Sequence, residues 1–226
     1  MAGHVRVGAG DGARTDRKPG DLVDTATPAA RAEQPRFVSR GGEKLEAALH
    51  EFKIEVAGRV CLDVGASTGG FTDVLLRRGA ARVYALDVGR GQLAESLRRD
   101  PRVVSMERTH AARLAPDSPQ RVSLPEPVSL AVIDVSFIPL ARILAAVRDQ
   151  LTADGQIVAL VKPQFEAPPA DAPRGVVRDP EVRRRAVDDV RRHAESIGLA
   201  PRGEIESPLT GPQGNHEYLL HLVRGS

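Results

Sequence analysis

The sequence predicts an α/β fold with a mostly parallel sheet, and three observations carry this prediction. Apolar runs alternate with helical patterns from residue 36 onward, which is the order that builds a parallel sheet with helices on both faces. The apolar run at 60–64 leads into a glycine-rich turn and then a helical pattern, an arrangement that brings backbone next to a nucleotide-like ligand. The short connection from 206 to 216 predicts a closing hairpin, and hence one antiparallel strand near the C-terminus.

Hydrophobic periodicity predicts the individual elements. Four apolar residues recur at helix spacing between 45 and 52, so a helix is expected over 39–52. Further helices are expected at 70–78, 91–98, 138–149 and 180–197, and strands at 60–64, 82–87, 102–106, 128–134, 156–161, 201–206 and 216–223. The last helix opens with Asp179 and Pro180, a cap followed by proline. Residues 163–178 are rich in proline and predict a loop that covers a site.

Composition divides the chain into a leader and one domain. Residues 1–35 lack an apolar period and predict a disordered leader, whereas residues 36–226 are expected to form the domain. The net charge of +2 and the pI of about 9.0 are a mild hint of an anionic partner. The single cysteine, Cys61, excludes an intrachain disulfide. Without a signal peptide or an uncharged apolar window, a cytoplasmic protein with no membrane partner is expected.

The turn at 65–69 matches two kinds of site. As Gly-x-Ser-x-Gly it fits the nucleophile elbow of α/β-hydrolases, in a strand–turn–helix context. That interpretation needs an acid and then a histidine, and the candidates are Asp134 with His193, His216 or His221. The turn lacks the Gly-x-Gly-x-x-Gly pattern of a dinucleotide site.

The same turn fits an S-adenosylmethionine site. Asp63 precedes the glycines and Asp87 ends the next apolar run, where a carboxylate can accept hydrogen bonds from ribose hydroxyls. A glycine turn needed only for packing a helix on a strand is the alternative without function.

Charged side chains from two neighbouring strands are expected together at one rim of the sheet. Asp134 and Lys162 end neighbouring strands, and the carboxyl ends of parallel strands face the ligand crevice. Glu217 begins the antiparallel strand, so it reaches the same rim, and Lys44 opens the helix before the first strand. Only four of the 32 basic residues are lysines, and lysine, unlike arginine, can lose its proton near neutral pH. A structural ion pair and solvated surface groups remain the alternatives.

Six blocks of sequence together resemble the FtsJ-like ribose methyltransferases, and most closely their TlyA (hemolysin A) type. The blocks lie at 38–45, 62–72, 132–138, 161–166, 175–180 and 211–215, and the resemblance spans about residues 36–223. It implies a Rossmann-like class I fold with a seven-stranded sheet. It also implies that S-adenosylmethionine is the cofactor, that no metal is needed, and that the catalytic tetrad is Lys44, Asp134, Lys162 and Glu217.

The resemblance also assigns binding residues. Those expected at the cofactor are Asp63, Gly65, Ala66, Ser67, Thr68, Gly69, Gly70, Phe71, Asp87, Val88, His110 and Asp134. His110 stands where the family commonly has asparagine, beside the adenine. Those expected at the substrate mouth are Arg36, Arg40, Phe137, Phe165 and Arg174. The two phenylalanines would stack a flipped base or belong to the core.

The expected reaction is methyl transfer to a ribose 2′-hydroxyl of ribosomal RNA, with ribosomal RNA or a ribosomal subunit as partner. Such a hydroxyl is a poor nucleophile, so the enzyme must align it and manage its proton. Lys162 would act as the base or, if it stays charged, would steer the hydroxyl. TlyA-type proteins usually begin with a small RNA-binding module, but only the leader precedes Arg36 here. The same chemistry on a small-molecule hydroxyl (nucleoside-like or of a secondary metabolite) is therefore an alternative, and a non-enzymatic hemolysin-like protein is another.

Overall fold

The structure is a computed structural model that describes residues 5–7, 29–31 and 36–225. They belong to two units, Met1–Arg36 and Phe37–Ser226, each described by itself. In the first unit, β1 (Val5–Val7) pairs antiparallel with β2 (Ala29–Arg31). The rest of the predicted leader lies outside the described residues, so its disorder stays a prediction.

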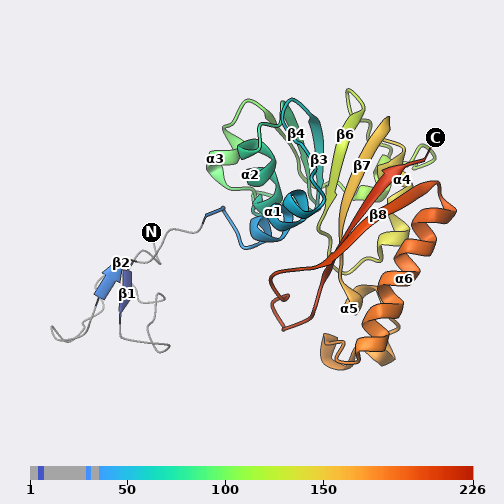
Figure 1. The fold of residues 1–226 in the computed structure, drawn as a ribbon. Coiled ribbons are helices and arrows are strands. Elements are labelled where there is room, and N and C mark those ends of the chain that lie inside the picture. Colours follow the sequence, from blue (N-terminus) through green and yellow to red (C-terminus); the bar gives the residue numbers. More distant parts are fainter. Residues whose placement is uncertain (1–4, 8–28, 32–35, 226) are drawn as a thin grey trace. The chain divides into compact units, whose positions relative to one another are not determined.

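The second unit contains a seven-stranded sheet in the order β5-β4-β3-β6-β7-β9-β8 (Figure 1). Its strands are β3 (Val60–Val64), β4 (Arg82–Leu86), β5 (Val103–Met106), β6 (Val128–Ile133), β7 (Leu151–Val161), β8 (Leu199–Glu206) and β9 (Tyr218–Arg224). β9 runs antiparallel to β7 and to β8, and the other pairs are parallel. This order confirms the predicted mostly parallel sheet with one antiparallel strand near the C-terminus.

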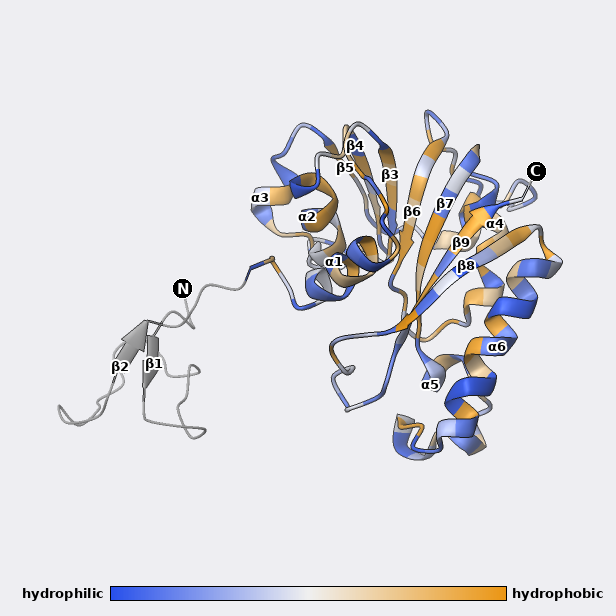
Figure 2. Ribbon diagram, viewed as in Figure 1, coloured by the Kyte–Doolittle hydropathy of each residue, from blue (hydrophilic) through white to orange (hydrophobic). Residues whose placement is uncertain are grey.

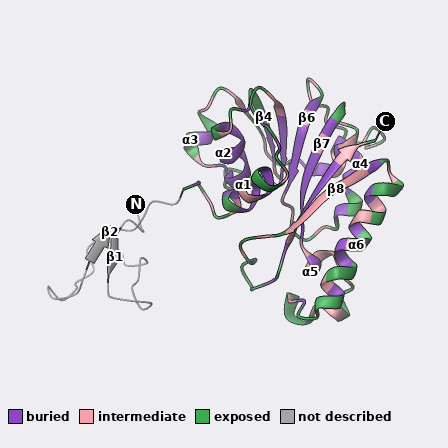
Figure 3. Ribbon diagram, viewed as in Figure 1, coloured by how far each residue is buried: buried purple, intermediate pink, exposed green. Residues whose placement is uncertain are grey.

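Helices cover both faces of the sheet (Figure 1). They are α1 (Gly41–Glu51), α2 (Gly70–Arg77), α3 (Glu95–Arg98), α4 (Leu144–Arg148), α5 (Pro163–Glu166) and α6 (Pro180–Ser196). Apolar residues of α1, α2 and α3 form one core cluster with the sheet, and those of α4 and α6 form a second on the opposite face. The central strands β3, β4, β6, β7 and β9 are mostly hydrophobic and buried, the edge strand β8 is only partly buried, and α6 exposes a hydrophilic face (Figures 2 and 3).

Several elements differ from their predicted bounds, for local reasons. The helix expected at 91–98 is only α3, because Gly91 has a left-handed φ of +65° and Ala94 has a non-helical ψ of 139°. The helix expected at 138–149 is divided into a 3-10 turn, Leu140–Arg142, and α4, with the non-helical Ile143 between them. The segment at 163–178 is not plain loop, since α5 and the 3-10 turns Pro169–Asp171 and Pro173–Gly175 each begin at a proline.

The carboxyl ends of β3, β6 and β7 lie at one edge of the sheet because these strands are parallel neighbours. The turn after β3 is pressed against the end of β6: a Cβ on Gly65 would lie 2.2 Å from the carbonyl oxygen of Asp134. Gly65 also has a φ of +86°, which favours glycine. The turn therefore presents bare backbone at this edge.

Candidate active site

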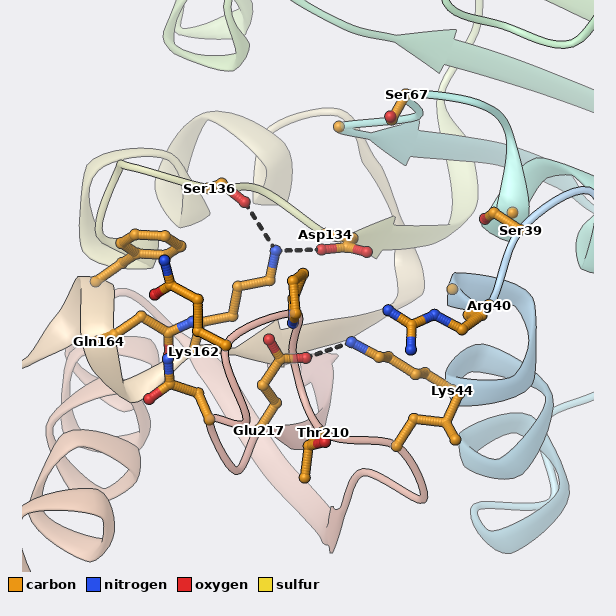
Figure 4. Close-up of a pocket in the computed structure, with 18 of the residues that line it drawn as sticks. Ser39, Arg40, Lys44, Ser67, Asp134, Ser136, Lys162, Gln164, Thr210 and Glu217 are labelled. Atoms are coloured by element: carbon orange, nitrogen blue, oxygen red, sulfur yellow. Dashed lines mark hydrogen bonds and ion pairs between the residues drawn. The ribbon is translucent and has the colours of Figure 1, made fainter. Parts of the chain in front are cut away.

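A cavity of about 560 Å³ opens at this edge of the sheet (Figure 4). Its walls come from the start of α1, the glycine turn after β3, the loops after β6 and β7, and the β8–β9 connection. Segments far apart in sequence therefore share one site, as expected at the carboxyl ends of an open α/β sheet.

The four residues of the expected tetrad all line this cavity, as two lysine–carboxylate pairs (Figure 4). The Nζ of Lys162 lies 2.6 Å from Asp134 Oδ1 and also donates to Ser136 Oγ at 3.0 Å. The Nζ of Lys44 donates to Glu217 Oε2. Strand pairing explains how Glu217 arrives here: Tyr218 pairs with Val161, so the residue before β9 lies beside the residue after β7.

Lys44 and Glu217 are a buried charge pair. The exposed fractions of their side chains are 10% and 1%. A Cβ on Gly211 would lie 2.6 Å from Glu217 Oε1, so the β8–β9 connection packs closely over this carboxylate. By contrast, the Asp134 side chain is 25% exposed, and that of Lys162 is 12% exposed. The Asp134–Lys162 pair is thus the one more open to a ligand.

Most of the predicted cofactor residues line the cavity. These are Gly65, Ala66, Ser67, Thr68, Gly70, Phe71 and Asp134. Gly69 does not line it, and serves as the left-handed N-cap of α2 with a φ of +99°.

Asp63 lies beneath the glycine turn and not on the cavity wall. Its side chain is fully buried, Thr72 Oγ1 donates to its Oδ2 at 2.6 Å, and its Oδ1 has no hydrogen-bond partner among the described residues. Burial raises the pKa of Asp63 to about 7; the hydrogen bond from Thr72 lowers it, and the charge of Asp134 raises it. Asp63 therefore supports the turn from behind and is a buried, titratable group.

Asp87 lies in a small cleft that adjoins the cavity. The cleft and the cavity share Ala66 and Ser67. The Asp87 carboxylate accepts from the backbone N–H of Ser67 at 2.8 Å and from that of Gly89 at 2.7 Å, so it joins the glycine turn to the loop after β4. Each carboxylate oxygen keeps a lone pair for a further donor.

Two predicted cofactor residues line neither the cavity nor the cleft. Val88 is 64% exposed. The His110 Nδ1 accepts from the backbone N–H of Ala112 at 3.1 Å, so this side chain caps a 3-10 turn.

Two phenylalanines and two arginines stand at the mouth of the cavity. Phe137 and Phe165 both line it, with ring centroids 5.0 Å apart and a tilt of 50°. The Phe137 residue is 89% exposed and has a left-handed φ of +66°. Arg40 and Arg174 also line the cavity. Arg36 belongs to the first unit, so it is not placed relative to this site.

The cavity also contains polar residues that the sequence analysis did not single out. They are Ser39, Ser136, Gln164, Thr210, Gln213 and Asn215. Asn215 is buried; its Oδ1 accepts from the backbone N–H of Val177 at 3.0 Å, and its Nδ2 donates to the carbonyl of Gly175 at 2.8 Å. Ser136 and Asn215 both fall in blocks that carried the family resemblance, which was the available signal.

The hydrolase interpretation of the glycine turn is wrong. His216 pairs with Glu206, and His221 with Gln156 at 3.0 Å. The Nε2 of His193 is buried and has no hydrogen-bond partner in the part of the chain that the structure describes. None of these three histidines lines the cavity that contains Ser67, so a Ser–His–Asp relay is not assembled.

The described residues form neither a cluster suited to a metal ion nor a helix suited to a membrane. Across 36–225 and the two short strands, no group of three or more His, Cys, Asp and Glu side chains is arranged to hold a metal ion. In the same part of the chain, no helix is both long and apolar enough to span a bilayer.

Comparison with known proteins identifies the family. Residues 37–224 match the model of the FtsJ-like methyltransferases. The chain belongs to this family. The 16S/23S rRNA (cytidine-2′-O)-methyltransferase TlyA of Mycobacterium tuberculosis is 49% identical over 223 residues, or 98% of this chain and 80% of the relative. The resemblance to the TlyA type is therefore confirmed, and it is wider than residues 36–223, since the match takes in most of residues 1–35.

Solved structures agree with this assignment. A protein from Streptococcus thermophilus that is named a hemolysin aligns with a TM-score of 0.82 and 43% identity, over 99% of this chain and 80% of its own. A protein from Listeria monocytogenes, named an S-adenosylmethionine dependent methyltransferase, aligns with a TM-score of 0.60 over 83% of this chain and all of its own. At 17% identity the second likeness concerns the fold alone, and it confirms the class I methyltransferase fold.

Proposed function

We propose that this protein is an S-adenosylmethionine-dependent 2′-O-methyltransferase that acts on ribose in ribosomal RNA. The observation that carries the proposal is the meeting of two lysine–carboxylate pairs in one cavity with the glycine turn. Lysine and carboxylate groups that can orient a hydroxyl and accept its proton, beside a nucleotide-binding turn, suit methyl transfer to that hydroxyl. The 49% identity to an enzyme named as an rRNA (cytidine-2′-O)-methyltransferase supports ribosomal RNA as the substrate class.

The residues present fit the cofactor. At Gly65 a Cβ would lie 2.2 Å from the backbone carbonyl oxygen of Asp134, so this position of the turn must stay bare backbone, which is the surface that an adenosine group can approach closely. The turn and the Asp87 carboxylate would hold that group in the cleft and cavity that share Ala66 and Ser67. When bound, S-adenosylmethionine would supply a methyl group activated on a sulfonium, for transfer to the hydroxyl oxygen with the thioether sulfur as the leaving group.

Lys162 is the group that would hold the substrate hydroxyl. Its partner Asp134 is 25% exposed, whereas Glu217, the partner of Lys44, is 1% exposed, and Asp134 orients the Lys162 amine from 2.6 Å. A neutral Lys162 would take the hydroxyl proton; a charged Lys162 would donate a hydrogen bond to the oxygen and leave the proton to water. The pH dependence of the single-turnover rate separates the two roles, because the rate rises as the ammonium deprotonates in the first case and falls in the second.

The aromatic pair and the arginines at the mouth would engage the RNA. The exposed ring of Phe137, backed by Phe165 at 5.0 Å, can stack an unpaired base. Arg40 and Arg174 line the same cavity, and guanidinium groups form strong hydrogen bonds with phosphates. A target nucleotide drawn out of its stack would then have its base on the rings and its ribose beside Lys162.

A labelling experiment tests the proposal. The protein is incubated with methyl-labelled S-adenosylmethionine and, in separate arms, with ribosomal subunits, naked ribosomal RNA and a panel of nucleosides. Label in RNA that survives alkali as a dinucleotide is the expected result, because a 2′-O-methyl group blocks cleavage of the adjacent phosphodiester. Lys162→Ala, with cofactor affinity retained, should slow transfer by about a hundredfold or more and leave a measurable residual rate. Label found only in nucleosides would show that the substrate is a small molecule and not RNA. No transfer in any arm would refute the proposed methyltransferase activity.

A further inference from the structure

The amine of Lys162 has two partners in the described part of the chain, and only one of them is charged. Asp134 Oδ1 lies 2.6 Å from Nζ, and Ser136 Oγ accepts from Nζ at 3.0 Å. Figure 4 shows the amine between these two side chains, both from the loop after β6. The Asp134 carboxylate already balances the charge of Lys162, so the hydrogen bond to the Ser136 hydroxyl must have another role.

An amine held at one point is free to rotate and tilt. A lysine ammonium has three N–H groups on a flexible four-carbon stem, and a single carboxylate fixes only one of them. A second acceptor from a different direction fixes a second N–H and thereby the direction of the third. With Asp134 and Ser136 as the two acceptors, the remaining N–H, or the lone pair after deprotonation, is the one available to a substrate oxygen in the cavity.

The backbone holds the two acceptors in a fixed relation. The N–H of Asp134 donates to the carbonyl of Val64 at 2.9 Å, which extends the β3–β6 ladder to this residue. Phe137 then turns the chain with a φ of +66°, a conformation that costs a residue with a Cβ about 1 kcal/mol or more. Ser136 therefore lies between a residue anchored in the sheet and a residue in a left-handed turn.

We propose that Ser136 is a positioning residue that, together with Asp134, aims the Lys162 amine at the substrate hydroxyl. This role rests on the proposed function, since Lys162 is there the group that meets the hydroxyl. Ser136 acts through Lys162 and does not itself exchange a proton with the substrate. A serine hydroxyl suits this role because it can accept from an ammonium and can rotate to donate to a neutral amine.

Kinetics of single and double variants test the role. Ser136→Ala should lower kcat by about tenfold or more, the loss expected for a hydrogen bond to a charged group, with the RNA KM and the cofactor Kd unchanged. Ser136→Thr keeps a hydroxyl and should recover most of the rate. In the Lys162→Ala background, Ser136→Ala should cause no further loss. Ser196→Ala, an exposed serine on α6 outside the cavity, is the control that should match wild type.

Two results would overturn the positioning role. One is a wild-type rate for Ser136→Ala. The other is an equal loss from Ser136→Ala with and without Lys162, because it would mean that the serine acts on the substrate independently.

A spectroscopic readout keeps the inference separate from the activity. The chain has four lysines, Lys18, Lys44, Lys53 and Lys162, so protein labelled with ¹³C at lysine Cε gives four signals, and Lys162→Arg identifies one. Ser136→Ala should move the Lys162 signal and leave the other three in place. An unmoved Lys162 signal contradicts the contact even if the enzyme methylates RNA; a moved signal in a protein that methylates no RNA refutes the proposed function alone.

Discussion

Lys44 and Glu217 lie 173 positions apart in the sequence, and their side chains form a buried ion pair on the wall of the cavity. One comes from the first turn of α1 and the other from the residue before β9. The pair therefore ties the helix that precedes the sheet to its only antiparallel strand within the seven strands described.

Removing one member of this pair should destabilise the protein strongly. Glu217→Ala leaves the buried Lys44 ammonium without its partner, and such single losses cost about 3–5 kcal/mol. The combined change Glu217→Ala with Lys44→Met removes both charges and should cost less than the sum of the single changes. Urea unfolding at pH 7 measures both. Asp171→Ala, which breaks the exposed pair with Arg185, should change stability by less than about 1 kcal/mol; equal effects at the two sites would contradict the prediction.

Asp63 predicts a pH dependence of stability. Its pKa is raised by burial from 3.8 to about 7, so between pH 4 and 7 the folded protein holds this proton while the unfolded chain releases it. The stabilising contribution is complete below about pH 4 and is lost as the pH rises toward 7. At about 1.4 kcal/mol per pKa unit, the loss is on the order of 4 kcal/mol.

The Asp63 contribution is isolated by difference. Asp63→Asn cannot ionise, so the gap between wild type and variant, measured by urea unfolding from pH 4 to pH 8, should change in favour of the variant as the pH rises. Asp117→Asn, at an exposed residue, should show a constant gap. A constant gap for Asp63→Asn as well would mean that the carboxyl is not held protonated.

The sequence predicted where the charged residues of the site would meet, because strand direction decides it. Asp134 and Lys162 follow neighbouring parallel strands, and Glu217 precedes the antiparallel one, so apolar runs alone place them at one edge. Roles that depend on loop conformation were not predictable in this way. The contacts of Ser136 with Lys162 and of Phe137 with Phe165 depend on the left-handed backbone conformation at Phe137. No rule based on composition predicts that conformation at a phenylalanine.

The sequence predicted the backbone of the expected cofactor site better than the positions of its side chains. The glycine turn lies where its pattern indicated, since bare backbone is what such a turn provides. Asp63 was expected at the cofactor because it precedes the turn, but β3 is buried on both faces and its side chain packs against Thr72 of α2. His110 was expected beside adenine, and it caps a 3-10 turn with its own ring nitrogen.

Substitution of Asn215 tests whether the segment around Arg174, at the rim of the cavity, contributes to RNA binding. Its side-chain amide bonds to the backbone of Val177 and Gly175, which fixes the segment that carries Arg174. Asn215→Ala should raise the RNA KM by up to about thirtyfold, through loss of two hydrogen bonds of about 1 kcal/mol each, with little change in cofactor Kd. Asn215→Asp keeps the acceptor for Val177 but not the donor for Gly175, so it should fall between. Limited proteolysis of the variant should detect faster cleavage near residue 174. Faster cleavage with an unchanged RNA KM would mean that this segment does not contribute to RNA binding.

Substitution of Phe137 should affect RNA binding without reducing the stability of the fold. Its ring is exposed and its φ is left-handed, so Phe137→Gly removes little buried area and relieves backbone strain. Stability should therefore be unchanged or should rise by about 1 kcal/mol. Methylation of RNA should nevertheless fall about tenfold to a hundredfold, because base–aromatic stacking contributes about 1–3 kcal/mol.

The comparison with Phe137→Trp completes this test. Tryptophan keeps an aromatic face at the same backbone position, so it should retain most of the RNA activity while keeping the strain that glycine removes. Activity and stability should thus move in opposite directions between the two variants. If Phe137→Gly instead lost stability and activity together, the ring would be a packing residue for Phe165. The stacking role would then have to be given up, since an exposed ring that supports the fold need not touch a base.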